Sequence, residues 1–296
     1  MYLLLVISAL LMTANTALTK LFQKTTPSGV FHMLVYNLIN AAFACVFFWV
    51  SAGFKISVSI ETIVYAVVYA LIICINLSAQ IFAFSRAPVS VVTLMTMAGG
   101  VLLPSVFGII KFNEPLTLRL FFSSVLIIIA AVLPFAGKRG EKKAFSVSAA
   151  AVCLLMFVLS GLSVILLKLY ALDTRVCDSE SMFFLTNAAI VIICAAVLAI
   201  IRIKKGESGF FKKILRAYAP IHLLNIVSKT ALANIASVLQ VIILAEMAAS
   251  TFSVLNSALT LLGAGAVSTL LFREKQSVLS VAALALAAVA IVINPT

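Results

Sequence analysis

Uninterrupted apolar stretches of about 20 residues constrain this chain more than any other feature. Residues 144–167 and 181–201 contain no charged side chain, and only 10% of all residues are charged. Soluble globular proteins carry roughly 25% charged residues. A chain this poor in charge cannot cover its surface in water, so we expect lipid to be its solvent. One apolar helix of about 20 residues is long enough to cross a bilayer.

Backbone hydrogen bonding decides between the two architectures that can span lipid. Every buried N–H and C=O needs an internal partner, which leaves α-helices or a closed β-barrel. Barrel strands would show segments of about ten residues with alternating polarity, and the apolar stretches here do not alternate. We therefore predict an all-α integral membrane protein with ten transmembrane helices. They are expected at residues 1–22, 30–52, 61–86, 88–111, 116–136, 145–171, 180–203, 216–245, 249–272 and 276–294.

The two halves of the chain resemble each other at fixed offsets. A shift of 160 residues places Glu114 on Glu274, and shifts of 148 to 150 align the beginnings of the halves. The aligned pairs include Gln80 with Gln240, Ser90 with Ser250, Lys20 with Lys168, and Asn37 with Asn187. These matches predict two five-helix repeats, residues 1–140 and 141–296. Because five is odd, the second repeat enters from the opposite face, which is the inverted-topology construction of many secondary transporters.

The basic residues are distributed unevenly between the two predicted membrane faces. Five of the 21 Lys and Arg residues fall on the face that carries both termini, fifteen fall on the other, and Lys229 lies within a span. Cytoplasmic loops are enriched in Lys and Arg, so we expect a multi-pass protein of the cell membrane with both termini outside. The net charge of +12 does not indicate nucleic-acid binding, because the basic residues lie in short loops.

Three short motifs agree with this architecture. The first predicted helix contains Asn15-Thr16-Ala17-Leu18-Thr19-Lys20, the fourth ends in Phe112-Asn113-Glu114-Pro115-Leu116-Thr117, and the ninth ends in Phe272-Arg273-Glu274-Lys275-Gln276-Ser277. Together with the helix number and the repeat, they resemble the drug/metabolite transporter superfamily and its EamA-like ten-helix members. The resemblance implies a central cavity lined by helices 1–4 and 6–9, and alternating access. Asn113 departs from the family pattern, which has glycine there.

Lys229 is the most informative polar residue within a predicted span. A lysine near mid-depth costs roughly 2.5–3.5 kcal/mol on insertion scales, so it is rare unless it faces a cavity or a partner. Asn225 and Gln240 share its helical stripe. We predict that these three side chains bind substrate. The alternative is that Lys229 reaches the interface or bonds backbone carbonyls.

Further candidates come from the repeat-related helix and from isolated asparagines. Tyr69, Asn76 and Gln80 form the corresponding stripe in the third helix, although tyrosines also occur as interfacial residues. Asn15, Asn37 and Asn187 lie in helices 1, 2 and 7. Each asparagine could contact substrate or could form an interhelical hydrogen bond.

The polar and charged residues expected within the spans also limit the functions that the chain could have. No Asp or Glu is expected at mid-depth, so a cavity around Lys229 would favour an anionic or zwitterionic metabolite such as an amino acid or organic acid. A cationic drug or quaternary-amine exporter of the same superfamily, or a lipid-carrier flippase, is the alternative. An enzyme is not expected, because His32 and His222 have no acid beside them and no metal or nucleotide motif is present. No cofactor is expected, H⁺ or Na⁺ coupling stays open, and a monomer could function.

Overall fold

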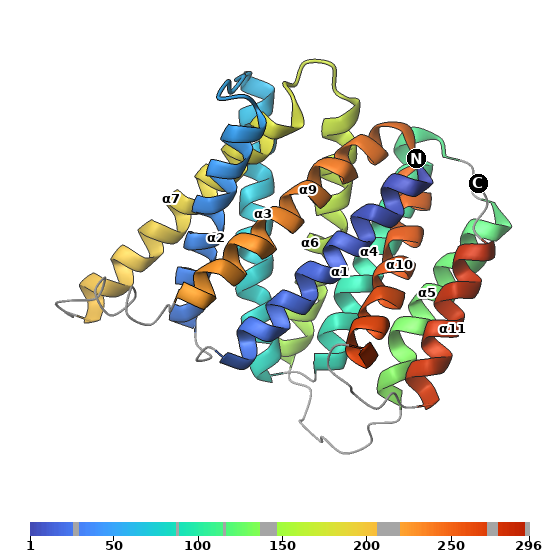
Figure 1. Cartoon of the computed structure of the whole chain (residues 1–296). Helices are drawn as coiled ribbons and strands as arrows, with labels where there is room; N and C mark the ends of the chain where they lie inside the picture. The colour runs from blue at the N-terminus through green and yellow to red at the C-terminus, as the bar shows by residue number, and fades with distance from the viewer. Residues whose placement is uncertain are drawn as a thin grey trace. The chain divides into compact units, whose positions relative to one another are not determined.

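The computed structural model describes residues 1–25, 30–86, 89–114, 117–136, 147–205, 220–270 and 278–293, and the regular structure in these ranges is helical (Figure 1). The first five helices are α1 (Tyr2–Thr25), α2 (Val30–Ser51), α3 (Ile60–Arg86), α4 (Val89–Phe112) and α5 (Leu118–Ala136). The next five are α6 (Val147–Leu172), α7 (Ser179–Lys205), α9 (Pro220–Glu246), α10 (Ala249–Leu270) and α11 (Val278–Ile293).

Six of these helices are long and apolar enough to cross a membrane, so the chain is a multi-pass helical membrane protein. The qualifying segments are 34–51, 95–112, 151–172, 179–201, 223–246 and 249–267. The other four described helices contain shorter apolar stretches, at 2–15, 60–76, 118–130 and 281–293. Large apolar side chains such as Ile203 and Val292 are 80% and 85% exposed, as a lipid solvent permits.

The observed helix ends lie close to those expected from the apolar stretches. The expected boundary between the eighth and ninth spans is confirmed: α9 ends at Glu246 and α10 begins at Ala249. Two other ends have left-handed backbone, with φ of 60° at Gly53 after α2 and 51° at Asn113 after α4. Glycine and asparagine are the residues that most readily terminate a helix in this way.

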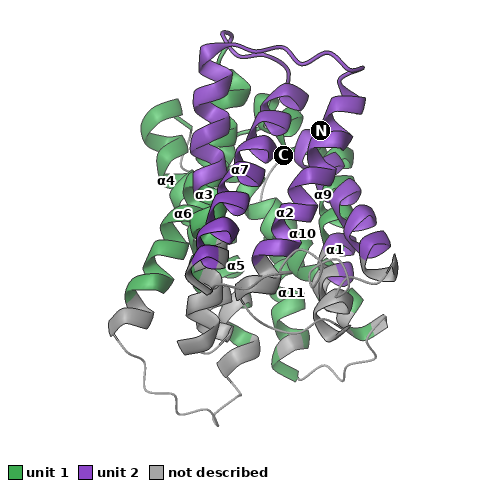
Figure 2. Cartoon of the chain, turned by 90° about the vertical axis from the view of Figure 1, so that its left-hand side faces the viewer, with its two compact units in different colours: residues 1–13, 72–173, 239–296 green, residues 14–71, 174–238 purple. Residues whose placement is uncertain are grey.

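The chain divides into two compact units, coloured green and purple in Figure 2. Unit 1 comprises residues 1–13, 72–173 and 239–296, and unit 2 comprises residues 14–71 and 174–238. Helices α1, α3 and α9 each contribute one part to unit 1 and the other part to unit 2. Both units therefore draw on both sequence halves, and the boundary between residues 140 and 141 stays a prediction.

Small residues allow the helices of unit 1 to approach closely. On α4, a Cβ at Gly99 would clash with the Phe157 carbonyl oxygen of α6, and a Cβ at Gly161 would lie 2.7 Å from the Gly99 carbonyl oxygen. Helices α5 and α11 lie side by side (Figure 1), with buried Ala287 and Ala290 in one core cluster with Ile127. Close packing at small residues is the usual basis of helix association in lipid.

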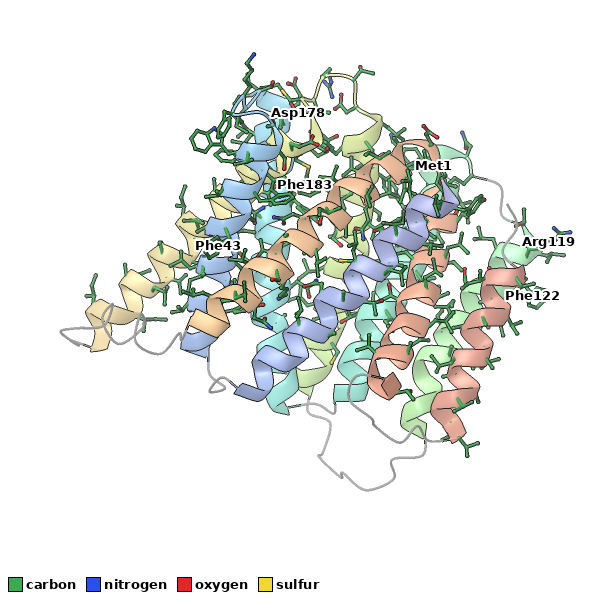
Figure 3. All side chains as sticks on the ribbon, viewed as in Figure 1. Met1, Phe43, Arg119, Phe122, Asp178 and Phe183 are labelled. Carbon is green, nitrogen blue, oxygen red and sulfur yellow. The ribbon has the colours of Figure 1, made fainter. Side chains whose placement is uncertain are left out.

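Unit 2 is built around the packing of α2 against α7. Phe183 of α7, labelled in Figure 3, stacks on Phe48 of α2 with ring centroids 5.3 Å apart. The Tyr69 ring of α3 contacts the Phe183 ring, and their centroids are 6.3 Å apart. Asp178 caps the start of α7, because its Oδ2 accepts a hydrogen bond from the Ser181 N–H at 2.8 Å.

Candidate functional site

The site is centred on Lys229 of α9 and Tyr36 of α2, both in unit 2. The Lys229 ammonium donates a hydrogen bond to the Tyr36 hydroxyl and lies 4.5 Å from the centroid of the Tyr36 ring. A cation within about 6 Å of an aromatic ring is attracted by the ring's quadrupole. One side chain therefore contacts Lys229 through both its hydroxyl and its π face.

Apolar packing fixes Tyr36 in place. Its side chain is 9% exposed and belongs to a core cluster with Val35, Leu198 and Ile226, which come from α2, α7 and α9. A buried aromatic ring has few alternative rotamers in a packed core. The phenol is consequently held at a defined position beside the lysine.

A second hydrogen bond joins the same two helices one residue further along α9. The Thr230 hydroxyl lies 2.7 Å from both the Asn40 Oδ1 of α2 and the Ile226 carbonyl oxygen. Asn40 lies four residues after Tyr36 on α2, so both side chains are on the same face of that helix, one turn apart. The α2–α9 contact is thus polar at two consecutive turns.

The site retains unused hydrogen-bonding capacity. A lysine ammonium has three N–H donors, and Tyr36 is the acceptor that Lys229 contacts. Within the described residues, no carboxylate forms an ion pair with Lys229. One turn earlier on α9, the Oδ1 atom of Asn225 is buried without a hydrogen-bond partner in the described part of the chain. The Lys229 ammonium could therefore bind an anionic group, and the Asn225 Oδ1 could bind a hydrogen-bond donor.

Four other residues expected at the site also belong to unit 2. Asn37 follows Tyr36 on α2, and Asn15 lies on α1; both are half-buried. Asn187 donates its Nδ2 to the Phe183 carbonyl oxygen at 2.7 Å, within its own helix. Tyr69 packs against Phe183. The described hydrogen bond of Asn187 therefore stays within its own helix, and the described contact of Tyr69 is with an aromatic ring.

Three predicted site residues belong to unit 1. Asn76 on α3 and Gln240 on α9 are half-buried. Gln80 lies in α3, but its side chain is outside the described residues. The predicted role of all three stays a prediction.

Sequence reasoning missed Tyr36, Asn40 and Thr230. Tyr36 and Asn40 stand four residues apart in the second predicted helix, and Thr230 follows Lys229 directly. A polar stripe on the second helix could have been recognised from this spacing. Nothing in the sequence shows that this stripe meets α9, because Lys229 and Tyr36 are 193 residues apart.

Metal-binding chemistry is not indicated by the described residues, in which no group of three His, Cys, Asp or Glu side chains could hold an ion. None of the five cysteines, all of which lie in the described residues, forms a disulfide.

Comparison with solved structures shows that the fold of this chain is shared with other proteins. No protein-family model matches the chain, and no curated protein matches it. Among solved structures, 28 chains match. One of them, described only as "Crystal structure of protein", has a TM-score of 0.72 over 98% of this chain and 94% of its own, at 14% identity. At this identity the likeness shows that the fold is shared, and nothing more.

Proposed function

We propose that the chain is a secondary transporter that moves a small anionic or zwitterionic metabolite across the membrane by alternating access. The observation that carries this proposal is Lys229, a lysine within an apolar span whose partner among the described residues is a tyrosine rather than a carboxylate. Charged residues within membrane spans are costly and usually mark solute or ion pathways. Such a charge is best offset by a negative group that arrives with the solute.

The polar atoms around Lys229 define what the solute would carry. A carboxylate or similar oxyanion would accept from the free N–H donors of Lys229. The Asn225 Oδ1, one helical turn away, would accept from a hydroxyl or ammonium group. A solute with both groups would satisfy both positions, so we expect an amino acid or an organic acid.

We infer further that the chain is a ten-helix, EamA-like member of the drug/metabolite transporter superfamily with inverted repeats. Two close approaches in unit 1 support the repeat. A Cβ at Gly263 of α10 would clash with Thr13 of α1, and a Cβ at Gly161 of α6 would clash with Leu103 of α4. The shift of 148 carries Thr13 to Gly161, and the shift of 160 carries Leu103 to Gly263.

The departure at Asn113 is compatible with that family pattern. Its φ of 51° lies in the left-handed region, which glycine and asparagine tolerate best. Asparagine can therefore replace the family's glycine at the end of this helix without changing the backbone.

Ligand-dependent thermal stability tests the proposal on the purified protein. A ligand that binds the native state raises its stability by RT ln(1 + [L]/Kd). Wild type and Lys229→Gln would be heated with amino acids, organic acids and phosphorylated metabolites, and with quaternary amines and polyamines. Lys55→Gln is the matched control, because Lys55 is exposed and its loss removes the same charge.

We expect an anion or zwitterion to stabilise wild type and Lys55→Gln but not Lys229→Gln, and the same solute to show counterflow in proteoliposomes. Stabilisation by cations alone, equal in all three proteins, would show a cation exporter instead. Stabilisation only by a lipid-linked carrier, added as a further ligand, would point to a flippase. Both results would contradict the proposed solute class.

A further inference from the structure

The break between α9 and α10 is held by two charged side chains from other helices. Helix ends leave backbone groups without intrahelical partners. At the end of α9, the Lys168 ammonium of α6 donates to the carbonyl oxygens of Leu244 and Met247, at 2.6 and 2.8 Å. Lys168 is 6% exposed and lies 5.9 Å from the Phe112 ring centroid.

The start of α10 is held by the opposite charge. Glu114, which follows α4, accepts hydrogen bonds from the Ala249 N–H at 2.8 Å and the Ser250 N–H at 3.3 Å. It also accepts from the Ser250 hydroxyl. A helix carries partial negative charge at its C-terminus and partial positive charge at its N-terminus. Each side chain therefore sits at the helix end of opposite sign.

The two charges come from a closely packed pair of helices. Helices α4 and α6 approach at Gly99 and Gly161 with no room for a Cβ at either position. Glu114 is aimed by the left-handed turn at Asn113, and its N–H donates to the Gly108 carbonyl oxygen at 3.1 Å. A Cβ at Gly108 would collide with the Glu114 carboxylate. The positions of both charges are thus set by α4 and α6.

We propose that Lys168 and Glu114 act together as one clamp that locks the α9–α10 break to the α4–α6 pair, so that these segments of unit 1 move as one body. This goes beyond the proposed function, because the clamp operates whatever the solute is. It also differs from an ordinary salt bridge. The described hydrogen bonds of both charges go to the two helix ends, and the attraction between Lys168 and Glu114 is long-range.

Hydrogen–deuterium exchange of the peptide that contains Ala249 and Ser250 tests the clamp without any ligand. Glu114→Gln should speed exchange at these amides at least about tenfold, because it removes charge-assisted bonds from them. Lys168→Met should also speed exchange there, although the described acceptors of Lys168 are the Leu244 and Met247 carbonyl oxygens, at the end of α9 and directly after it. Two independent caps would leave the Lys168→Met exchange unchanged, and that result would overturn the single clamp.

The charge-swapped double variant, Lys168→Glu with Glu114→Lys, separates a clamp from a salt bridge. A salt bridge would recover in the swap. A clamp would not recover, because each new charge would face a helix end of its own sign. Exchange at Ala249 and Ser250 should then be faster than in either single variant. Recovery of wild-type exchange would overturn the proposal.

Two further variants keep the test decisive if the swapped protein does not fold. Gly108→Ala retains both charges but displaces the Glu114 carboxylate, and it should mimic Glu114→Gln. Glu180→Gln is the matched control, because Glu180 lies in the first turn of α7 and accepts from the neighbouring Ser179 hydroxyl at 3.0 Å. It should leave exchange at Ala249 and Ser250 unchanged, and wild-type exchange in Gly108→Ala would count against the clamp.

Discussion

Lys168 and Lys229 both lie within apolar spans of this chain, and their surroundings differ. Lys168 in unit 1 donates to two backbone carbonyl oxygens and is attracted by Glu114. Lys229 in unit 2 donates to one phenol, and no carboxylate of the described residues is paired with it. Both ammonium groups also lie near an aromatic ring, of Phe112 and Tyr36 respectively.

The difference separates a structural charge from a charge available for binding. Burying a charge is unfavourable unless hydrogen bonds and opposite charge offset the lost hydration. The hydrogen bonds of Lys168 complete a helix end, so its cost is offset within the protein. Among the described residues Lys229 has one acceptor, Tyr36, for its three N–H donors, so under the proposed function part of its cost is offset only when a solute binds. Removing Lys168 should therefore lower the stability, whereas removing Lys229 should leave it unchanged or raise it.

The largest expected effect is on stability in Lys168→Met. Methionine preserves the length of the side chain but leaves the Leu244 and Met247 carbonyl oxygens without their charged donor. Each lost bond to a charged group is worth about 1.5–3 kcal/mol, so we expect unfolding to become easier by about 3 kcal/mol. Thermal unfolding in detergent measures the loss. A melting temperature equal to that of wild type would remove the distinction between the two lysines.

The corresponding variant, Lys229→Met, should keep its stability or gain up to about 2 kcal/mol. The mutation relieves the burial of a charge, which costs roughly 2.5–3.5 kcal/mol in a span, and it sacrifices one hydrogen bond to Tyr36. The same unfolding experiment, run without solute, compares the two variants directly. A loss as large as that of Lys168→Met would mean that Lys229 is structural.

Tyr36→Phe sharpens the comparison within the site. Phenylalanine keeps the ring that lies 4.5 Å from Lys229 but removes the hydroxyl that accepts a hydrogen bond from the Lys229 ammonium. We expect a change in stability of about 1 kcal/mol and a change of several-fold in the Kd for the stabilising anion. Titration calorimetry measures that Kd. Tyr36→Leu, which also removes the ring, should have a larger effect on binding; an equal effect would assign no role to the ring.

Hydropathy predicted the helices well because lipid imposes one simple constraint on a spanning segment. The expected ends of most spans differ by one to three residues from the observed helices. The expected boundary between the eighth and ninth spans is also present, after Glu246. The backbone hydrogen bonds of each helix are local, so a single sequence is enough to locate them.

The contacts between helices could not be predicted in the same way. Lys168 lies near the end of a predicted span, and nothing in the sequence shows that it is buried and bonds residues 76 and 79 positions away. Glu114 stands at the end of the fourth predicted helix, but the helix it caps begins 135 residues later. Lys229 was recognised because it interrupts an apolar span, yet its partner Tyr36 carries no such signal. Helix pairing is a property of packing, which hydropathy does not encode.

The smallest effect concerns Thr230 and distinguishes satisfied from unsatisfied hydroxyls. Thr230→Val removes the hydrogen bond to Asn40, and interhelical bonds in membranes average about 0.6 kcal/mol. Thr186 is its control, because this residue is 1% exposed and its Oγ1 has no hydrogen-bond partner among the described residues. Thr186→Val should be neutral or slightly stabilising, since it removes an unpaired buried group. Thermal unfolding should therefore give changes of opposite sign. A similar loss in both variants would indicate that Thr186 has a partner such as water, and that unit 2 holds further polar sites beside Lys229.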